Sequence, residues 1–265
     1  MTSLLGILAG FLVIIGGALS DNDPLSSLFS VTAVIIVICG SFAAATVQFG
    51  LSNILFAFRC VFWLVKPPKT DLRAFIELVS EWSAIARSQG TLALEPVIPN
   101  VKDPFHKQGL QMIVDNTAPE DFAAVLAVMG EKIGRMQEVP ADVWEALGGY
   151  SPTIGVMGAV LGLIHVMMRL DHSEELGEGI ATAFVATIYG VGFANLVALP
   201  LGARLKHLAR ELERERHVVI QGFLLLAEGK PGLVIKQHLQ SFLEDEPKAK
   251  AAPDGEPVVM PQAAE

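Results

Sequence analysis

The part of the sequence that decides the fold is residues 148–205, which read GGYSPTIGVMGAVLGLIHVMMRLDHSEELGEGIATAFVATIYGVGFANLVALPLGARL. No charged residue occurs in 146–168, and none occurs in 179–203. Each interval is longer than the roughly 20 apolar residues that cross a bilayer as a helix. The short acidic segment DHSEELGE between them therefore predicts a tight transmembrane hairpin.

Small residues recur along both helices of this expected hairpin, and polar side chains occur among its apolar ones. Helices in lipid associate by close packing, which small residues at a spacing of four permit. The pattern predicts a helix pair that packs against other helices around a functional path. The small residues are Gly155, Gly158 and Gly162 on the first helix and Ala186, Gly190 and Ala194 on the second; the polar ones are Thr153, His165, Thr182, Thr187, Tyr189 and Asn195.

Two further spans are predicted near the start of the chain. The apolar run from Leu4 to Leu19 lacks the basic residues that precede the apolar core of a signal peptide, so it is interpreted as a first transmembrane helix. A turn at residues 21–24 leads to a second charge-free span from Leu28 to Leu51. The aromatic segment from Ile54 to Val65 predicts a helix at the membrane surface.

Residues 52–147 are predicted to form this interfacial helix and a helical domain in the cytoplasm. Apolar residues at helical spacing indicate one helix from Leu72 that ends at Gly90, and a short helix over 103–115. Thr117 is expected to cap a third helix that starts at Ala118. This helix is expected to run through Trp144 into the third span, with a bend near Pro140 and a break at Gly148-Gly149.

The rest of the chain is expected to be helical over 206–243, with a disordered tail from Glu244. Basic residues gather in 69–147 and 204–216, and the first predicted turn has none. Because basic loops remain on the cytoplasmic side, both termini and the long loop are placed in the cytoplasm. The fold class is an all-α membrane protein: spans at 1–51 and 148–205, with cytoplasmic helices between and after them.

Composition excludes several classes of function. The net charge of -9 argues against nucleic acid as a partner. The sequence has no cluster of metal ligands and no Gly-rich phosphate loop after a strand, so an enzyme is not expected. No Asp, Glu, Lys or Arg lies inside a predicted span. Since proton paths through membranes normally use an ionisable group, a second chain must supply it.

The chain resembles the MotA/PomA stator subunits of the bacterial flagellar motor over nearly all of residues 4–243. More distant similarity extends to the TolQ and ExbB proton-channel subunits. The motifs of the resemblance are ARSQGTLALE at 86–95, DPFHKQGLQMIVDNT at 103–117, GGYSPTIGVMGAVLGLIHVM at 148–167, ELGEGIATAFVATIYGVGFANLVALPL at 175–201 and AEGKPG at 227–232.

The resemblance implies a multi-pass protein of the bacterial inner membrane that works in a ring of five. The ring would surround two copies of a MotB-type partner, which has a single span, an ion-binding aspartate and a peptidoglycan-binding domain. Ion flow would turn the ring against the rotor protein FliG. No cofactor is implied; the transported ion would be H+ or, as the alternative, Na+.

The resemblance also assigns roles to individual residues. Thr187 matches a pore-facing threonine; Thr153, one of the polar residues of the hairpin, is expected on the same ion path. Ala159 stands where sodium-driven relatives usually have threonine, which favours protons. Pro152 and Pro200 match prolines that couple ion flow to movement, the alternative being simple helix ends. Residues matched to rotor contact are Arg87, Glu95 and Glu131, the alternative being a solvated charged surface.

Two other functions remain open at this point. An ExbB/TolQ-like subunit would energise an outer-membrane system, and a neighbouring gene for a TonB or TolA link would favour it. A four-span scaffold without ion flux would tolerate a large apolar residue at Thr187. His165 could relay protons because imidazole titrates near neutral pH, although a neutral, hydrogen-bonded histidine is the expectation.

Overall fold

The computed structural model describes residues 2–20, 29–68, 71–168 and 173–244. Within those residues every regular element is a helix, so the predicted all-α class is confirmed. The chain forms two compact units. The first unit comprises residues 1–70 and 127–216, and the second comprises 71–126 and 217–265. The expected turn at 21–24 and the tail at 245–265 lie outside the described residues.

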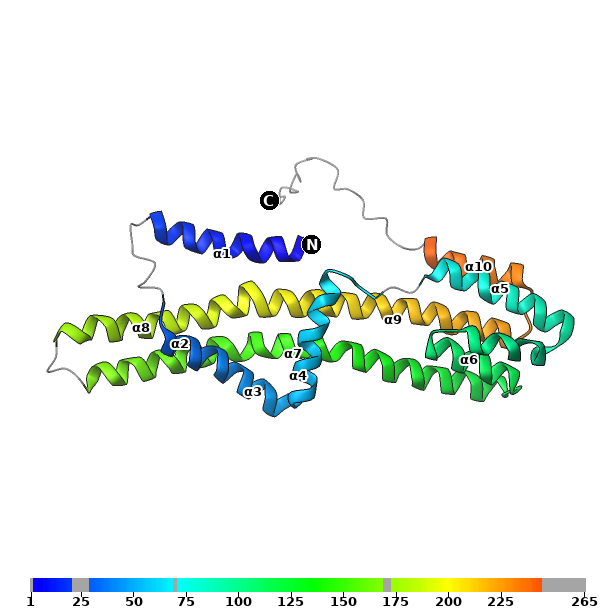
Figure 1. Ribbon diagram of the computed structural model, residues 1–265, viewed down its shortest axis with the longest axis horizontal. Helices are drawn as coiled ribbons and strands as arrows, with labels where there is room; N and C mark the ends of the chain where they lie inside the picture. Colours follow the sequence, from blue (N-terminus) through cyan, green and yellow to red (C-terminus); the bar gives the residue numbers. More distant parts are fainter. Residues whose placement is uncertain (1, 21–28, 69–70, 169–172, 245–265) are drawn as a thin grey trace, which may run out of the picture. The chain divides into compact units, whose positions relative to one another are not determined.

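The first unit contains the apolar helices (Figure 1). Among the described residues, three segments are long and apolar enough to cross a membrane, Val31–Phe49, Glu120–Met167 and Gly179–Ala227; the start of the second and the end of the third belong to the second unit. Leu5–Gly17 is a shorter apolar helical segment. The elements of this unit are α1 Thr2–Ser20, α2 Val31–Val34, the π-helix η2 Ile35–Cys39, α3 Gly40–Phe49, α4 Leu51–Cys60, the 3-10 helix η3 Val61–Leu64, most of α7 Pro119–Met167, α8 Ser173–Gly192, the π-helix η5 Phe193–Ala198 and the first part of α9 Leu199–Ala227.

The second predicted span ends two residues earlier than expected. Helix α3 stops at Phe49 because Gly50 has a φ of 78°, a left-handed conformation that glycine adopts without steric cost. The next helix, α4, then begins directly at Leu51, three residues before the predicted start of the interfacial helix. One glycine therefore ends one helix and starts the next.

The predicted break at Gly148-Gly149 is wrong. Helix α7 runs without interruption from Pro119 to Met167 and includes Gly148, Gly149 and Pro152. Close packing explains the glycine: a methyl group on Gly148 would lie 2.6 Å from Cγ of Leu199. Gly148 thus allows a neighbouring helix to approach, and it does not end its own.

The predicted cap of α7 is also one residue early. The helix begins at Pro119, and the carbonyl oxygen of Ala118 accepts the first bond, from the Phe122 amide at 2.9 Å. Ala118 is therefore the N-cap and Thr117 precedes it. Proline is favoured at the first helical position because its missing N–H would have no partner there.

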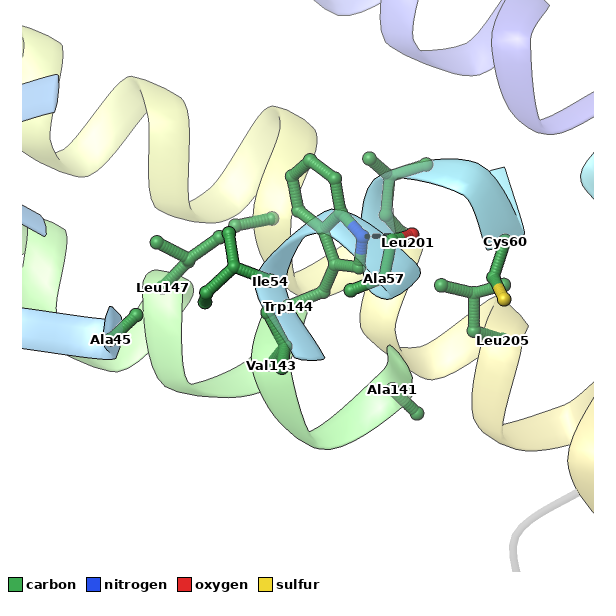
Figure 2. Packing of buried hydrophobic residues seen from close by; sticks show 11 residues of the cluster. Ala45, Ile54, Ala57, Cys60, Ala141, Val143, Trp144, Leu147, Leu201 and Leu205 are labelled. Carbon is green, nitrogen blue, oxygen red and sulfur yellow. Dashed lines mark hydrogen bonds between the residues drawn. The ribbon is translucent and has the colours of Figure 1, made fainter. Parts of the chain in front are cut away.

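Helix α4 packs against α7 and α9 in an apolar cluster, shown in Figure 2. The Trp144 indole on α7 contributes ring surface and also donates a hydrogen bond of 3.4 Å from Nε1 to the Ala57 carbonyl. A buried tryptophan needs such a partner for its N–H. The buried members of the cluster are Ala45, Ile54, Ala57, Cys60, Ala141, Val143, Trp144, Leu147, Ala198, Leu201 and Leu205.

The second unit contains short amphipathic helices with capped ends. Asp71 accepts a hydrogen bond from the Ala74 amide at 3.0 Å, and Asp103 accepts one from the Phe105 amide at 2.8 Å. Gly90, with a φ of 87°, ends α5 as predicted. Its elements are α5 Leu72–Gln89, the 3-10 helix η4 Thr91–Asn100, α6 Pro104–Val114, the start of α7, the end of α9 and α10 Gly232–Glu244.

An aromatic cluster forms the core of the second unit. Phe223 is fully buried, and its ring centroid lies 5.6 Å from that of Phe75 and 6.2 Å from that of Trp82. The His106 imidazole lies 4.8 Å from the Phe75 ring. Aromatic pairs at these separations stabilise a core beyond the area that they bury.

The burial of His106 predicts that the second unit is less stable in acid. Burial among the rings lowers the pKa of His106 below its ordinary value of 6.5, although Asp103 partly opposes this effect. Because the folded unit disfavours the charged imidazole, its stabilisation is complete above pH 6.5 and is lost as the pH falls toward the lowered pKa. We expect amides of α5 to lose protection from hydrogen exchange between pH 7 and pH 5.5, after correction for intrinsic rates. A His106→Gln variant that kept the full pH dependence would contradict this prediction.

Candidate functional site

The two helices of the predicted hairpin, α7 and α8, touch through their backbones. A methyl group on Gly155 would lie 2.9 Å from the Ala186 carbonyl oxygen, and one on Gly190 would lie 2.5 Å from the Ser151 carbonyl oxygen. A methyl group on Gly162 would lie 3.2 Å from Cα of Ala183. Real Cβ atoms do not approach other atoms as closely as at Gly155 and Gly190, so only glycine fits at these two positions, and Gly162 leaves little room for a side chain. The predicted role of the small residues in helix packing is confirmed.

A cavity of about 560 Å³ opens among α2, α7 and α8. Three of its lining residues are polar: Thr32 on α2, His165 on α7 and Thr182 on α8. His165 has no hydrogen-bond partner among the described residues, so the hydrogen bond expected for this histidine is not observed. Thr32 was not predicted, because no feature of the second span relates it to the hairpin. The remaining lining residues are Ala33, Ile36, Gly158, Leu161, Gly162, Val166, Gly179 and Ala186.

The three residues predicted for the ion path do not line this cavity. Ala159 and Thr187 are half-buried and each follows a lining residue in the sequence, so each points to a neighbouring face of its helix. Thr153 is exposed, and its hydroxyl donates to the Tyr150 carbonyl at 2.8 Å. Within the described part of the chain, the Thr187 hydroxyl forms no hydrogen bond to the backbone of its own helix. The Thr187 hydroxyl therefore differs from that of Thr153 in that its proton is not donated to the backbone of its own helix.

Both predicted coupling prolines lie inside long helical segments. Pro152 is in the interior of α7, and Pro200 is the second residue of α9, directly after the π-helix η5. The Leu199 amide donates to the carbonyl of Ala194, five residues earlier, which is the π-helical pattern. A proline in a helix removes a hydrogen bond and crowds the preceding turn, so a widened turn before Pro200 accommodates it.

A buried hydroxyl next to Pro152 was also missed in the sequence. Ser151 is fully buried, and within the described residues its Oγ has no hydrogen-bond partner. Buried polar atoms are normally paired. Ser151 therefore marks the contact between α7 and α8 as a place where packing dominates over polar pairing.

The residues predicted to contact the rotor divide between the two units. Arg87 lies in the last turn of α5, and Glu95 lies in η4, which replaces the expected loop. Both side chains are exposed, and neither forms an ion pair with another residue of 71–126. Glu131 belongs to the first unit and is paired with Arg135 at 2.5 Å.

Charged residues just before the predicted third span and just after the predicted fourth span form a small cluster. The Lys206 ammonium on α9 lies 3.1 Å from both carboxylate oxygens of Glu145 on α7. Burial raises the pKa of nearby Asp142, with Glu145 raising it further and Lys206 opposing the shift. Sequence reasoning missed this cluster because the ion-pair partners are 61 residues apart.

Comparison with known proteins identifies relatives along the whole chain. Residues 97–217 match the family model described as the MotA/TolQ/ExbB proton channel family. The chain is 33% identical to motility protein A of Bacillus subtilis over 96% of this chain and 95% of that protein. It is also similar to the flagellar MotAB stator complex from Bacillus subtilis (TM-score 0.80, 33% identity, 96% and 100% of the chains covered) and to C. jejuni MotAB (TM-score 0.80, 27% identity, 93% and 97% covered).

Proposed function

The chain belongs to the motility protein A family of flagellar motor stator subunits, and from this premise we propose that it is the ring-forming half of a proton channel that turns a rotor. It is a protein of the bacterial inner membrane. Its apolar helices form the membrane part, and its cytoplasmic helices exert force. The ExbB/TolQ-like alternative is not favoured, since the matching solved structures are MotAB stators.

The proposal depends most on one observation: the apolar stretches 4–19, 28–51, 146–168 and 179–203 contain no Asp, Glu, Lys or Arg. Moving one elementary charge across the membrane releases about 2.3 kcal/mol per 100 mV, and using it requires a site that changes charge. This chain lacks an acidic site at that depth. We therefore propose a MotB-type partner with one span, an ion-binding aspartate and a peptidoglycan-binding domain. The similarity to MotAB complexes supports such a partner.

The proposed ion path runs past Thr187, Ala159 and Thr153. The free hydroxyl of Thr187 would accept a hydrogen bond from the partner's carboxyl group or hold a water molecule. Ala159 and Ala186 offer no side-chain oxygen, whereas hard cations require several oxygen ligands. A proton needs only the carboxylate and water, so H+ is the proposed ion.

The ion can be tested in living cells. Motor rotation should stop when a protonophore collapses the proton gradient, and it should continue when sodium is removed from the medium. The measurement is the speed of tethered cells or beads that depend on this chain, with a strain lacking the chain as control. Rotation that stops on sodium removal alone would assign the path to Na+.

We propose that Pro152 and Pro200 couple ion flow to helix movement, and that Arg87, Glu95 and Glu131 contact the rotor protein FliG. Arg87 and Glu95 are exposed and form no ion pair with another residue of 71–126, which supports this role. Five copies would form a ring around two partner chains. Both termini would be cytoplasmic, with spans in 1–51 and 148–205 and cytoplasmic helices in 52–147 and 206–243.

Reversing the charge of Arg87 tests the rotor contact. Arg87→Glu should leave stators in the membrane and around motors but should abolish or strongly reduce torque, because an exposed charge that meets a partner affects binding more than folding. The measurement is motor speed together with counts of fluorescent stators at motors. Arg73→Glu, the same reversal at another exposed arginine of α5, is the control and should rotate normally. Equal loss from both variants would exclude a specific role for Arg87.

A further inference from the structure

Two long helices of the first unit are held together by side-chain contacts at both ends of a shared segment. The segment comprises residues 130–147 of α7 and 199–216 of α9, and we call it the paired segment. At one end the Lys206 ammonium contacts both carboxylate oxygens of Glu145 at 3.1 Å. At the other end the Arg216 guanidinium donates to the Gly130 carbonyl at 3.1 Å and to the Gln137 side chain. The helices are therefore antiparallel and held at two levels.

Backbone packing makes the Glu145 end close-fitting. A methyl group on Gly202 would lie 2.9 Å from Cγ of Glu145, 3.0 Å from its amide nitrogen and 3.2 Å from the Ala141 carbonyl oxygen. Helix α9 thus lies directly on the backbone from which Glu145 projects. The Glu145 and Lys206 side chains are 38% and 39% exposed, so water screens their attraction only in part.

The position of this ion pair along the chain is informative. Glu145 lies seven residues before Pro152, and Lys206 lies six residues after Pro200, as their numbers give. At about 1.5 Å per residue, each member is roughly 10 Å along its helix from a proline. Prolines weaken the hydrogen bonding of a helix locally. The segment of α7 contains a further proline, Pro140, and the contacts of Arg216 and of Glu145 hold the two helices together on either side of it. Any displacement at the prolines reaches the rest of α7 and α9 through this segment.

We infer that Glu145 and Lys206 are positioning residues for torque: their ion pair makes α7 and α9 move as one body where they leave the membrane. The inference rests on the proposed stator function. A surface ion pair contributes little to folding, but a pair between two helices fixes their relative sliding and rotation. Without the pair, α7 and α9 would be held at this level by packing at Gly202 alone, so they could shift more easily relative to each other when the membrane segments move, and less of that movement would reach the rotor.

The test is a charge exchange measured as torque per stator. The variants are Glu145→Lys, Lys206→Glu and the double exchange Glu145→Lys/Lys206→Glu, each expressed in cells that lack the native chain. Glu145→Gln and Lys206→Gln are added because they remove the pair without opposing like charges. Torque per stator is the step in motor speed as each stator joins, so it does not depend on how much protein accumulates. The control Glu211→Lys makes the same charge change on α9 at an exposed pair within one helix, His207–Glu211.

We expect torque per stator to fall in all four single variants, to recover in the double exchange and to remain normal in Glu211→Lys. Normal torque per stator in the single variants would overturn the inference, even if the amount of protein in the membrane fell, because the pair would then serve folding alone. Failure of the double exchange to recover torque would overturn it as well. The native chain is first tested for its ability to restore rotation in cells that lack it. If it does not restore rotation, the proposed stator function is contradicted instead.

Discussion

Replacing Gly190 by alanine is expected to abolish motor function. The added methyl group would lie 2.5 Å from the Ser151 carbonyl oxygen, 3.1 Å from Cα of Gly155 and 3.2 Å from Cα of Pro152. All three are backbone atoms, so no side-chain rotation can relieve the overlap and α7 and α8 must separate. Overpacking a close-packed contact costs about 1–3 kcal/mol. The separation of the helices would also displace Pro152, which we propose to couple ion flow to movement.

The measurement for Gly190→Ala combines the amount of protein in the membrane, resistance to unfolding in detergent, and swimming. Gly192→Ala is a matched control, because it makes the same change two residues away on α8 where nothing lies within 4 Å. The control should retain the stability and motility of the native chain. Normal swimming by Gly190→Ala would show that the close contact between α7 and α8 is not needed.

Elements whose signals lie within a short stretch of sequence were predicted well. The helix that ends at Gly90 and the helix between Asp103 and Asp115 appear where expected, because capping and helix ends depend on neighbouring residues. The glycines of the hairpin were also identified correctly as packing residues. Their spacing of three or four residues places them on one helix face, and close helix contact in lipid requires such a face.

Features that depend on the partner helix were not predictable. Gly148 looked like a break because glycine weakens an isolated helix, yet in the structure it accommodates Leu199 from α9. The same limit applies to Glu145 and Lys206, whose pairing follows from the antiparallel contact of α7 and α9. The π-helix before Pro200 has no signal of its own in the sequence, since proline alone does not determine how the preceding turn adjusts.

The site itself was predicted only in part. Thr187 and Ala159, expected on the ion path through family resemblance, do not line the cavity, and the cavity that contains His165 and Thr182 also requires Thr32 from α2. Contacts between segments so far apart in sequence are set by tertiary packing. A single sequence gives the face of each helix but does not show which faces meet.

Replacing Phe223 by alanine should have the largest effect on the second unit. Phe223 is fully buried, and its ring packs against Phe75, Trp82 and His106. Removing a buried phenylalanine side chain typically costs about 3–5 kcal/mol, through lost burial and the cavity that remains. Because small domains have only about 5–15 kcal/mol of stability, this loss should remove a large share of the stability of the second unit and make the unit open far more often.

Hydrogen exchange can locate the damage caused by Phe223→Ala. Amides of α5 and α10 should lose protection and torque should disappear, because the proposed rotor residues Arg87 and Glu95 depend on this unit for their positions. Leu233→Ala is the control: Leu233 is 68% exposed on α10, so its truncation removes little buried surface and should change neither measurement. If α5 and α10 remained protected in Phe223→Ala while torque was lost, the aromatic cluster would act on the rotor contact by a route other than the stability of the unit.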